Sequence, residues 1–283
     1  MTEPALYGTE IVREELMFSS RLYAVAIAIL SAYAALAAEP VDVVFKSKLD
    51  GTNQRYVVIL PDEFDAKKPH SVLIALHGHG SDRWQFVKDG RSECKAARDT
   101  AAKHKLIFVS PDYRAKTSWM GPAAEADVVQ IIEELKAKYR VNKVIVSGGS
   151  MGGTAALTFA ALHPELVDGV VSMNGTANLV EYDQFQDAIA ASFGGTKAEK
   201  PDEYRKRSAE LNLDQLTMPM ACTTGGKDQA VPPQSVLRLV EGLKAKKRPV
   251  KLIHRPDGGH STNHADATEA FEFVLSELAK SVN

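Results

Sequence analysis

A serine flanked by glycines is the clearest chemical signal in the sequence. Residues 147–153 read Ser-Gly-Gly-Ser-Met-Gly-Gly, so Ser150 has a glycine two positions before it and another two positions after it. An apolar run of strand length, 143–146, precedes this segment, and a helical pattern follows at 154–162. Such a turn between strand and helix exposes the hydroxyl at a tight bend. We predict that Ser150 is a nucleophile; the alternative, a phosphate-binding turn, lacks the lysine of a P-loop.

A serine hydroxyl needs a base to take its proton, and histidine is the usual one. His260 is the best of eight candidates, because the segment 256–260 lies between the last predicted strand and the last predicted helix. A loop there can reach back over the carboxyl ends of the strands. His254 within the strand and His264 at the start of the helix are the alternatives, whereas His163 at a helix end fits a capping or packing role.

A carboxylate is expected as the third member, because it holds the imidazole in one tautomer and stabilises its charged form. Asp228 follows the predicted strand 220–224 directly. Asp257 and Asp183 are the rival candidates, and a turn residue that accepts backbone N–H groups is the non-catalytic alternative for Asp228. The chain order is then serine, aspartate, histidine.

Donors for a developing oxyanion are expected where the first long strand ends. His77-Gly78-His79-Gly80 follows the predicted strand 71–76, and we assign the donors to the backbone N–H groups of His79 and Met151. The two imidazoles of this loop could also indicate a metal, but no third ligand lies nearby in the sequence. We therefore predict a site that needs neither a metal ion nor a cofactor.

Aromatic residues fall on segments expected near the same edge of the sheet. Trp119 and Trp84 are predicted to bind substrate, with Phe86 as a third wall of an acyl or sugar site. Ordinary packing is the alternative for all three.

The elements that position these residues alternate along the chain. Strands are predicted at 71–76, 106–110, 143–147, 167–173, 220–224 and 250–254, and helices at 92–104, 123–139, 154–162, 233–246 and 264–282. The strands are continuously apolar, which indicates burial on both faces by helices. We predict an α/β fold with a doubly wound, mostly parallel sheet.

Two segments depart from this alternation. Residues 41–45 and 55–60 flank the turn-rich Asp50-Gly51-Thr52-Asn53, so we predict an antiparallel hairpin that opens the domain. Residues 176–216 are polar and carry a charged stretch at 197–207, and we expect them to form a small helical cap over the carboxyl edge of the sheet.

The N-terminus has the composition of a secretory signal. Arg21 precedes an apolar stretch, 22–36, that ends in small residues before Glu39. We expect a signal peptide at about Met17–Ala37, translation that begins at Met17, and a secreted or periplasmic protein without a stable membrane anchor. A buried helix is the alternative. The predicted organisation is an extension and signal at 1–38 and a catalytic domain at 39–283.

Charge and cysteine content exclude several classes of protein. Thirty-four basic and 36 acidic residues give a net charge of −2 without a basic run, so no nucleic-acid partner is expected. Cys94 and Cys222 are too few for a disulfide scaffold and are predicted to be buried thiols, although export would permit a bridge between them.

With these residues in place, the segment from about 57 to 276 resembles the α/β-hydrolase superfamily. The His77–Gly80 loop, the Ser118–Gly121 loop and the Ser150 turn resemble secreted esterases of the feruloyl and acetylxylan type. Residues 204–208 together with 227–233 are similar to the catalytic domain of prolyl-oligopeptidase-type peptidases. The resemblance implies a serine hydrolase, and the two subgroups differ in substrate.

We expect an exported esterase that cleaves a small-molecule or polysaccharide-linked ester through an acyl-enzyme. A peptidase acting on short peptides is the main alternative, because it would use the same residues. The peptidases' oxyanion tyrosine has no clear counterpart after His77-Gly78, which favours the esterase. Acyl transfer to an alcohol and a non-catalytic binder are the remaining alternatives.

Overall fold

A computed structural model describes Met1 and residues 39–280 of the protein. The predicted signal peptide, Met17–Ala37, lies outside the described residues. Among the residues that are described, no helix combines the length and hydropathy needed to cross a membrane.

An eight-stranded sheet forms the centre of the fold. Its spatial order is β1-β2-β4-β3-β5-β6-β7-β8. β2 pairs antiparallel with both β1 and β4, and all other neighbours are parallel, as predicted for the opening hairpin and the doubly wound sheet. The strands are β1 (Val41–Lys46), β2 (Asn53–Ile59), β3 (His70–Leu76), β4 (Ile107–Pro111), β5 (Val141–Gly149), β6 (Gly169–Met173), β7 (Met220–Gly225) and β8 (Val250–Arg255).

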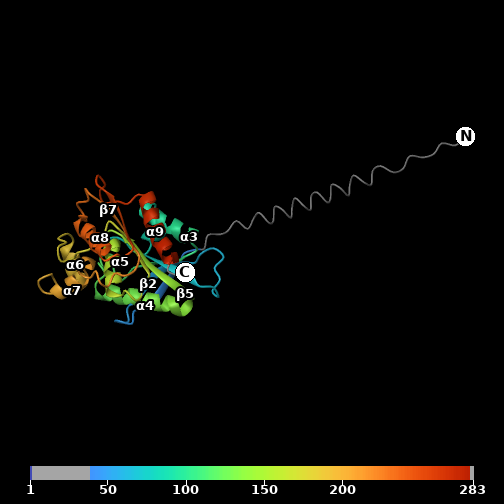
Figure 1. Cartoon of the computed structure of the whole chain (residues 1–283). Coiled ribbons are helices and arrows are strands. Elements are labelled where there is room, and N and C mark those ends of the chain that lie inside the picture. The colour runs from blue at the N-terminus through green and yellow to red at the C-terminus, as the bar shows by residue number, and fades with distance from the viewer. Residues whose placement is uncertain (2–38, 281–283) are drawn as a thin grey trace. The chain divides into compact units, whose positions relative to one another are not determined.

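Helices cover both faces of this sheet (Figure 1). Buried residues of α3 and α9 pack in one apolar cluster, and those of α4, α5 and α8 pack in another on the opposite face. The helices are α2 (Gln85–Lys88), α3 (Ser92–Lys103), α4 (Pro122–Lys138), α5 (Met151–Leu162), α6 (Gln186–Phe193), α7 (Pro201–Lys206), α8 (Gln234–Ala245) and α9 (His264–Lys280).

Successive residues of the central strands point to opposite faces, which explains their continuous hydrophobicity. In β3, Val72 and Ile74 join the cluster with α4 and α5, whereas Leu73 and Ala75 join the cluster with α3 and α9. All four side chains are fully buried. Burial on both faces requires apolar residues at every position of such a strand.

The two cysteines are free and buried, as predicted. Cys94 lies in the cluster on the α3 face, and Cys222 lies in the cluster on the opposite face. The sheet therefore separates the two thiols, and burial raises the pKa of each to about 12.

The expected cap consists of α6, α7 and a short 3₁₀ helix, η1 (Ala209–Leu211). Arg207, whose side chain is fully buried, ties this segment to the main domain. Its guanidinium donates to the carbonyl of Met120 at 2.8 Å and pairs with Glu125 of α4 at 2.6 Å and with Glu203 of α7 at 3.2 Å. A buried charge with several partners stabilises one arrangement of the segments that supply them.

Replacing this arginine should destabilise the protein strongly. In Arg207→Met, Glu125 and Glu203 lose their shared cation, so we expect the free energy of unfolding to fall by about 3–5 kcal/mol. Arg238→Met is the matched control, because Arg238 pairs with Glu181 and Glu210 at a more exposed position. It should cost less than about 1 kcal/mol. Urea denaturation measures both values, and equal losses would contradict the anchoring role of Arg207.

Candidate active site

Ser150 occupies the sharp turn between β5 and α5. Its backbone is in an unusual conformation, with φ 58° and ψ −122°. A Cβ at Gly148 would lie 2.4 Å from Gly152, and one at Gly152 would lie 2.0 Å from the carbonyl oxygen of Leu76. Only glycine fits these two positions, which accounts for the motif. The helix begins at Met151, three residues earlier than the sequence pattern indicates, so its N-terminus lies directly beside the hydroxyl.

The structure brings the three predicted triad residues together. The Oγ of Ser150 lies 2.9 Å from the Nε2 of His260, and the Nδ1 of His260 lies 2.7 Å from the Oδ2 of Asp228. The Asp228 carboxylate is buried, while the imidazole of His260 is partly exposed. The other oxygen of Asp228 accepts the backbone N–H groups of Ala230 and Val231 at 3.0 and 2.9 Å. Both oxygens therefore have fixed partners.

Close packing of two loops explains how residues so far apart in the chain meet. A Cβ at Gly225 would lie 2.2 Å from the carbonyl oxygen of Gly259, so the loop of Asp228 lies directly against the loop of His260. The backbone N–H of Lys227 donates to the carbonyl of Gly258 at 2.8 Å. These contacts set the distance between the imidazole and the acid.

The rival candidates lie elsewhere and have other partners. Both alternative acids are exposed and pair with lysines, Asp257 with Lys227 and Asp183 with Lys197. The histidines considered beside His260 also have other partners: His254 contacts Thr224, His264 contacts Asp99, and His163 contacts Glu125. Among the candidates weighed from the sequence, the combination Ser150, His260 and Asp228 is the one that the geometry supports.

The His77–Gly80 loop lies beside Ser150, at the end of β3. Gly78 and Gly80 donate their backbone N–H groups to the side chain of Gln85 and to the carbonyl of Lys116. The backbone N–H groups of His79 and Met151 have no hydrogen-bond partner within the described part of the chain. These two free donors are the ones expected for an oxyanion.

The imidazoles of His77 and His79 both have hydrogen-bonding partners within the described residues. His77 is fully buried, its ring nitrogens face the backbone carbonyls of Gly78 and Asp112, and burial lowers its pKa. His79 accepts a hydrogen bond from the indole of Trp119 at 3.1 Å. No group of three or more His, Cys, Asp or Glu side chains suited to a metal ion occurs among the described residues.

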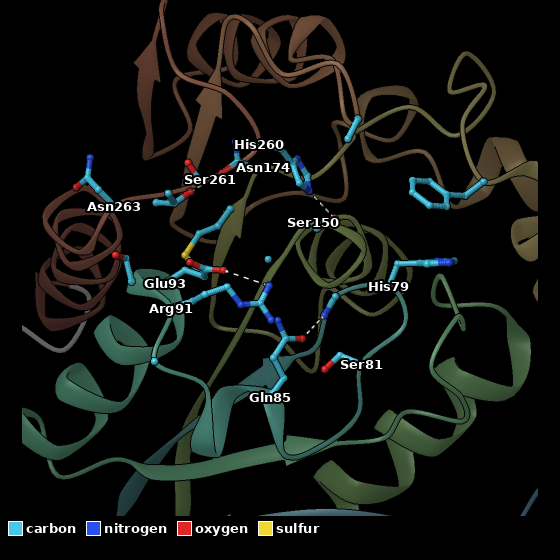
Figure 2. Close-up of a pocket in the computed structure, with 18 residues that line it drawn as sticks. His79, Ser81, Gln85, Arg91, Glu93, Ser150, Asn174, His260, Ser261 and Asn263 are labelled. Atoms are coloured by element: carbon cyan, nitrogen blue, oxygen red, sulfur yellow. Dashed lines mark hydrogen bonds and ion pairs between the residues drawn. The ribbon is translucent and has the colours of Figure 1, made fainter.

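A pocket of about 710 Å³ opens around Ser150 and His260. Figure 2 shows His79 on one side of Ser150, Glu93, Ser261 and Asn263 on the other, and Gln85 below. Most lining side chains are polar, and they come from the segments that follow β3, β5, β6, β7 and β8 and from the start of α3. An exposed aromatic ring is supplied by Phe185 at the start of the cap helix α6.

The two tryptophans predicted to bind substrate do not line this pocket in the described structure. Trp119 is fully buried beneath His79 and the cap residue Tyr182, because its loop turns the indole inward. Trp84 precedes the short helix α2, where Lys88 lies over its ring at 3.8 Å. Phe86 lies within α2 rather than on a loop and is fully buried.

Sequence reasoning missed several residues that do line the pocket. Phe185 lies in the cap, of which only the outline was expected. Gln85 belongs to the short helix α2, which was not predicted, and Glu93 lies in the first turn of α3. Glu93 approaches the nucleophile turn closely, since a Cβ at Gly149 would lie 3.7 Å from its Cγ. For Gln85 and Glu93, the available signal was a polar side chain close to the carboxyl edge of the sheet.

Comparison with known proteins agrees with this geometry. The model of the prolyl oligopeptidase family matches residues 113–280, more than half of the chain, including all three triad positions. The chain belongs to the prolyl oligopeptidase family. It is therefore a serine hydrolase of the α/β-hydrolase superfamily, as the sequence resemblance implied.

Relatives within this superfamily include both peptidases and esterases. Dipeptidyl aminopeptidase BIII of Pseudoxanthomonas mexicana is 26% identical over 47% of this chain and 21% of its own length. Feruloyl esterase C of Emericella nidulans is 25% identical over 44% of this chain and 49% of its own length. The chain thus spans less than half the length of either relative.

Solved structures share the fold at low identity. A puromycin hydrolase superposes with a TM-score of 0.69 and 17% identity over 86% of this chain and 40% of the other chain. FphF, a fluorophosphonate-binding serine hydrolase of Staphylococcus aureus, gives a TM-score of 0.63 and 20% identity over 87% of this chain and 99% of its own. These likenesses confirm the α/β-hydrolase architecture.

Proposed function

We propose that this family member hydrolyses carboxylic esters through an acyl-enzyme on Ser150. The observation that carries the proposal is the pair of short hydrogen bonds that link Ser150 to His260 and His260 to Asp228, at 2.9 and 2.7 Å. A serine oxygen within reach of an imidazole that is itself held by a buried carboxylate can give up its proton as it attacks.

The first half of the reaction forms the acyl-enzyme. The Oγ of Ser150 attacks the carbonyl carbon while its proton passes to the Nε2 of His260, and the carbonyl electron pair moves to the oxygen. The backbone N–H groups of His79 and Met151 donate to this oxyanion. The pair then returns, the bond to the alcohol oxygen breaks, and His260 donates its proton to the departing alkoxide.

The second half releases the acid. A water molecule loses a proton to His260 as its oxygen attacks the acyl carbon, and the tetrahedral adduct collapses with the bond to Ser150 breaking. His260 returns the proton to the Oγ. Asp228 stabilises the imidazolium in both halves.

Ester substrates are favoured over peptides for a chemical reason. An alkoxide is a better leaving group than an amine, which must be protonated before it departs, so the ester makes a smaller demand on His260. The relationship to Feruloyl esterase C supports this choice, whereas Dipeptidyl aminopeptidase BIII makes cleavage of short peptides the second candidate.

Two chromogenic substrates separate these candidates. We expect kcat/KM for p-nitrophenyl acetate to exceed that for a dipeptide p-nitroanilide by about 10³-fold. We also expect a rapid release of p-nitrophenol equal to the enzyme concentration before the steady state, because the acyl-enzyme accumulates. A higher kcat/KM for the dipeptide anilide would instead identify a peptidase.

A further inference from the structure

The loop that supplies one of the proposed oxyanion donors is fixed at each of its residues. The hydroxyl of Tyr113 donates to the carbonyl of His77 at 2.5 Å. The N–H of Gly78 donates to Gln85 at 2.7 Å, and that of Gly80 donates to a backbone carbonyl at 2.8 Å. The backbone N–H of His79 lies between them and has no hydrogen-bond partner among the residues that the structure describes.

The side chain of His79 is held by a tryptophan from a different segment. The Nε1 of Trp119 lies 3.1 Å from the Nδ1 of His79. An indole N–H can only donate, so the Nδ1 must accept and the neutral imidazole carries its proton on Nε2. Burial lowers the pKa of His79, which favours the neutral ring that this bond requires.

Trp119 is itself held rigidly. Its side chain is fully buried, and its ring centroid lies 5.6 Å from that of Tyr182 and 5.5 Å from that of Phe185. The N–H of Gly121 donates to the carbonyl of Ser118 at 2.9 Å, which closes the turn around the tryptophan. The indole is therefore a rigid donor set into the core beneath the loop.

We propose that Trp119 is a positioning residue that acts through the imidazole of His79 and aligns the backbone N–H of His79 with the oxyanion. The proposal rests on the ester-hydrolase function proposed above. An oxyanion donor is effective only when it lies about 2.7–3.1 Å from the developing charge. A displacement of about 1 Å within a reacting site can cost on the order of 10²-fold in rate.

The first test removes the indole N–H and keeps an aromatic ring. In Trp119→Phe we expect kcat for p-nitrophenyl acetate to fall about tenfold with KM changed less than about twofold, because the loss is confined to the transition state. Affinity for a trifluoromethyl ketone, whose serine adduct carries the oxyanion, should fall by the same factor. Trp84→Phe is the matched control, and both constants should stay near those of the wild type.

A second variant separates alignment from a general loss of packing. His79→Leu removes the acceptor and keeps the backbone N–H, so its effect on kcat should equal that of Trp119→Phe, and the double variant should be no worse than either single one. His79→Asn, which places an oxygen near the position of Nδ1, should lose less activity than His79→Leu.

Each outcome bears on one proposal. Unchanged kcat and ketone affinity in Trp119→Phe would overturn the positioning role. It would also be overturned if the fall in kcat of the double variant, Trp119→Phe with His79→Leu, equalled the product of the falls in the two single variants. The positioning role would also be overturned if Trp119→Phe lost activity through a higher KM while its affinity for the trifluoromethyl ketone stayed unchanged. A wild-type protein that does not cleave p-nitrophenyl acetate would instead contradict the proposed function, and the two failures are thereby distinguished.

Discussion

Replacing Ser150 with alanine should reduce ester hydrolysis by at least about 10⁴-fold, because the proposed acyl-enzyme can no longer form. The residual rate would come from the oxyanion donors and from substrate binding alone. The structure indicates that the variant folds, since alanine retains the Cβ at the turn and the backbone N–H of residue 150 still donates to Met173. The steady-state rate with p-nitrophenyl acetate, compared with the uncatalysed rate, measures the effect.

The matched control for this change is a serine far from the pocket. The hydroxyl of Ser276 donates to the carbonyl of Phe273 on the surface of α9, and Ser276→Ala should retain full activity. Ester hydrolysis by Ser150→Ala within tenfold of the wild type would mean that another residue supplies the nucleophile.

Converting Asp228 to asparagine should lower kcat by about 10⁴-fold with little change in the fold. Two backbone N–H groups, those of Ala230 and Val231, hold one side-chain oxygen of residue 228 in place. An asparagine would direct its oxygen to these donors and its NH₂ group to the Nδ1 of His260. The imidazole would then have to accept at Nδ1 and carry its proton on Nε2, where it could not take the proton of Ser150.

The same substitution at the rival acid provides the control. Asp257 is exposed and pairs with Lys227, so Asp257→Asn should keep kcat within about twofold of the wild type. Equal losses in the two variants, or a larger one in Asp257→Asn, would show that the acid has been assigned to the wrong loop.

The sheet and the three aligned side chains could be predicted because they depend on local signals. Strands buried on both faces are continuously apolar. The Gly-x-Ser-x-Gly pattern around Ser150 can be read within five residues, although the contact that requires Gly152 is with the distant Leu76. Asp228 and His260 follow the ends of successive strands, so the topology of a parallel sheet brings them to one edge. Each of these inferences requires only the order of elements along the chain.

The surroundings of the site could not be predicted, because they depend on contacts between distant segments. The orientation of Trp119 is set by His79, forty residues earlier, and by Tyr182 in the cap. A tryptophan on a loop near the site has the same sequence signature whether it faces the pocket or the core. Gln85 and Phe185 were missed because their short helices, α2 and α6, gain their stability mainly from tertiary packing.

The most direct measurement of the central claim is the site at which a fluorophosphonate probe becomes attached. Incubation of the wild-type protein followed by peptide mapping should give one adduct per chain, on the peptide that contains Ser150, because the activated Oγ attacks phosphorus as it would attack an ester carbonyl. Ser150→Ala should give none. An adduct on a different residue, or labelling of Ser150→Ala at the wild-type rate, would contradict the account.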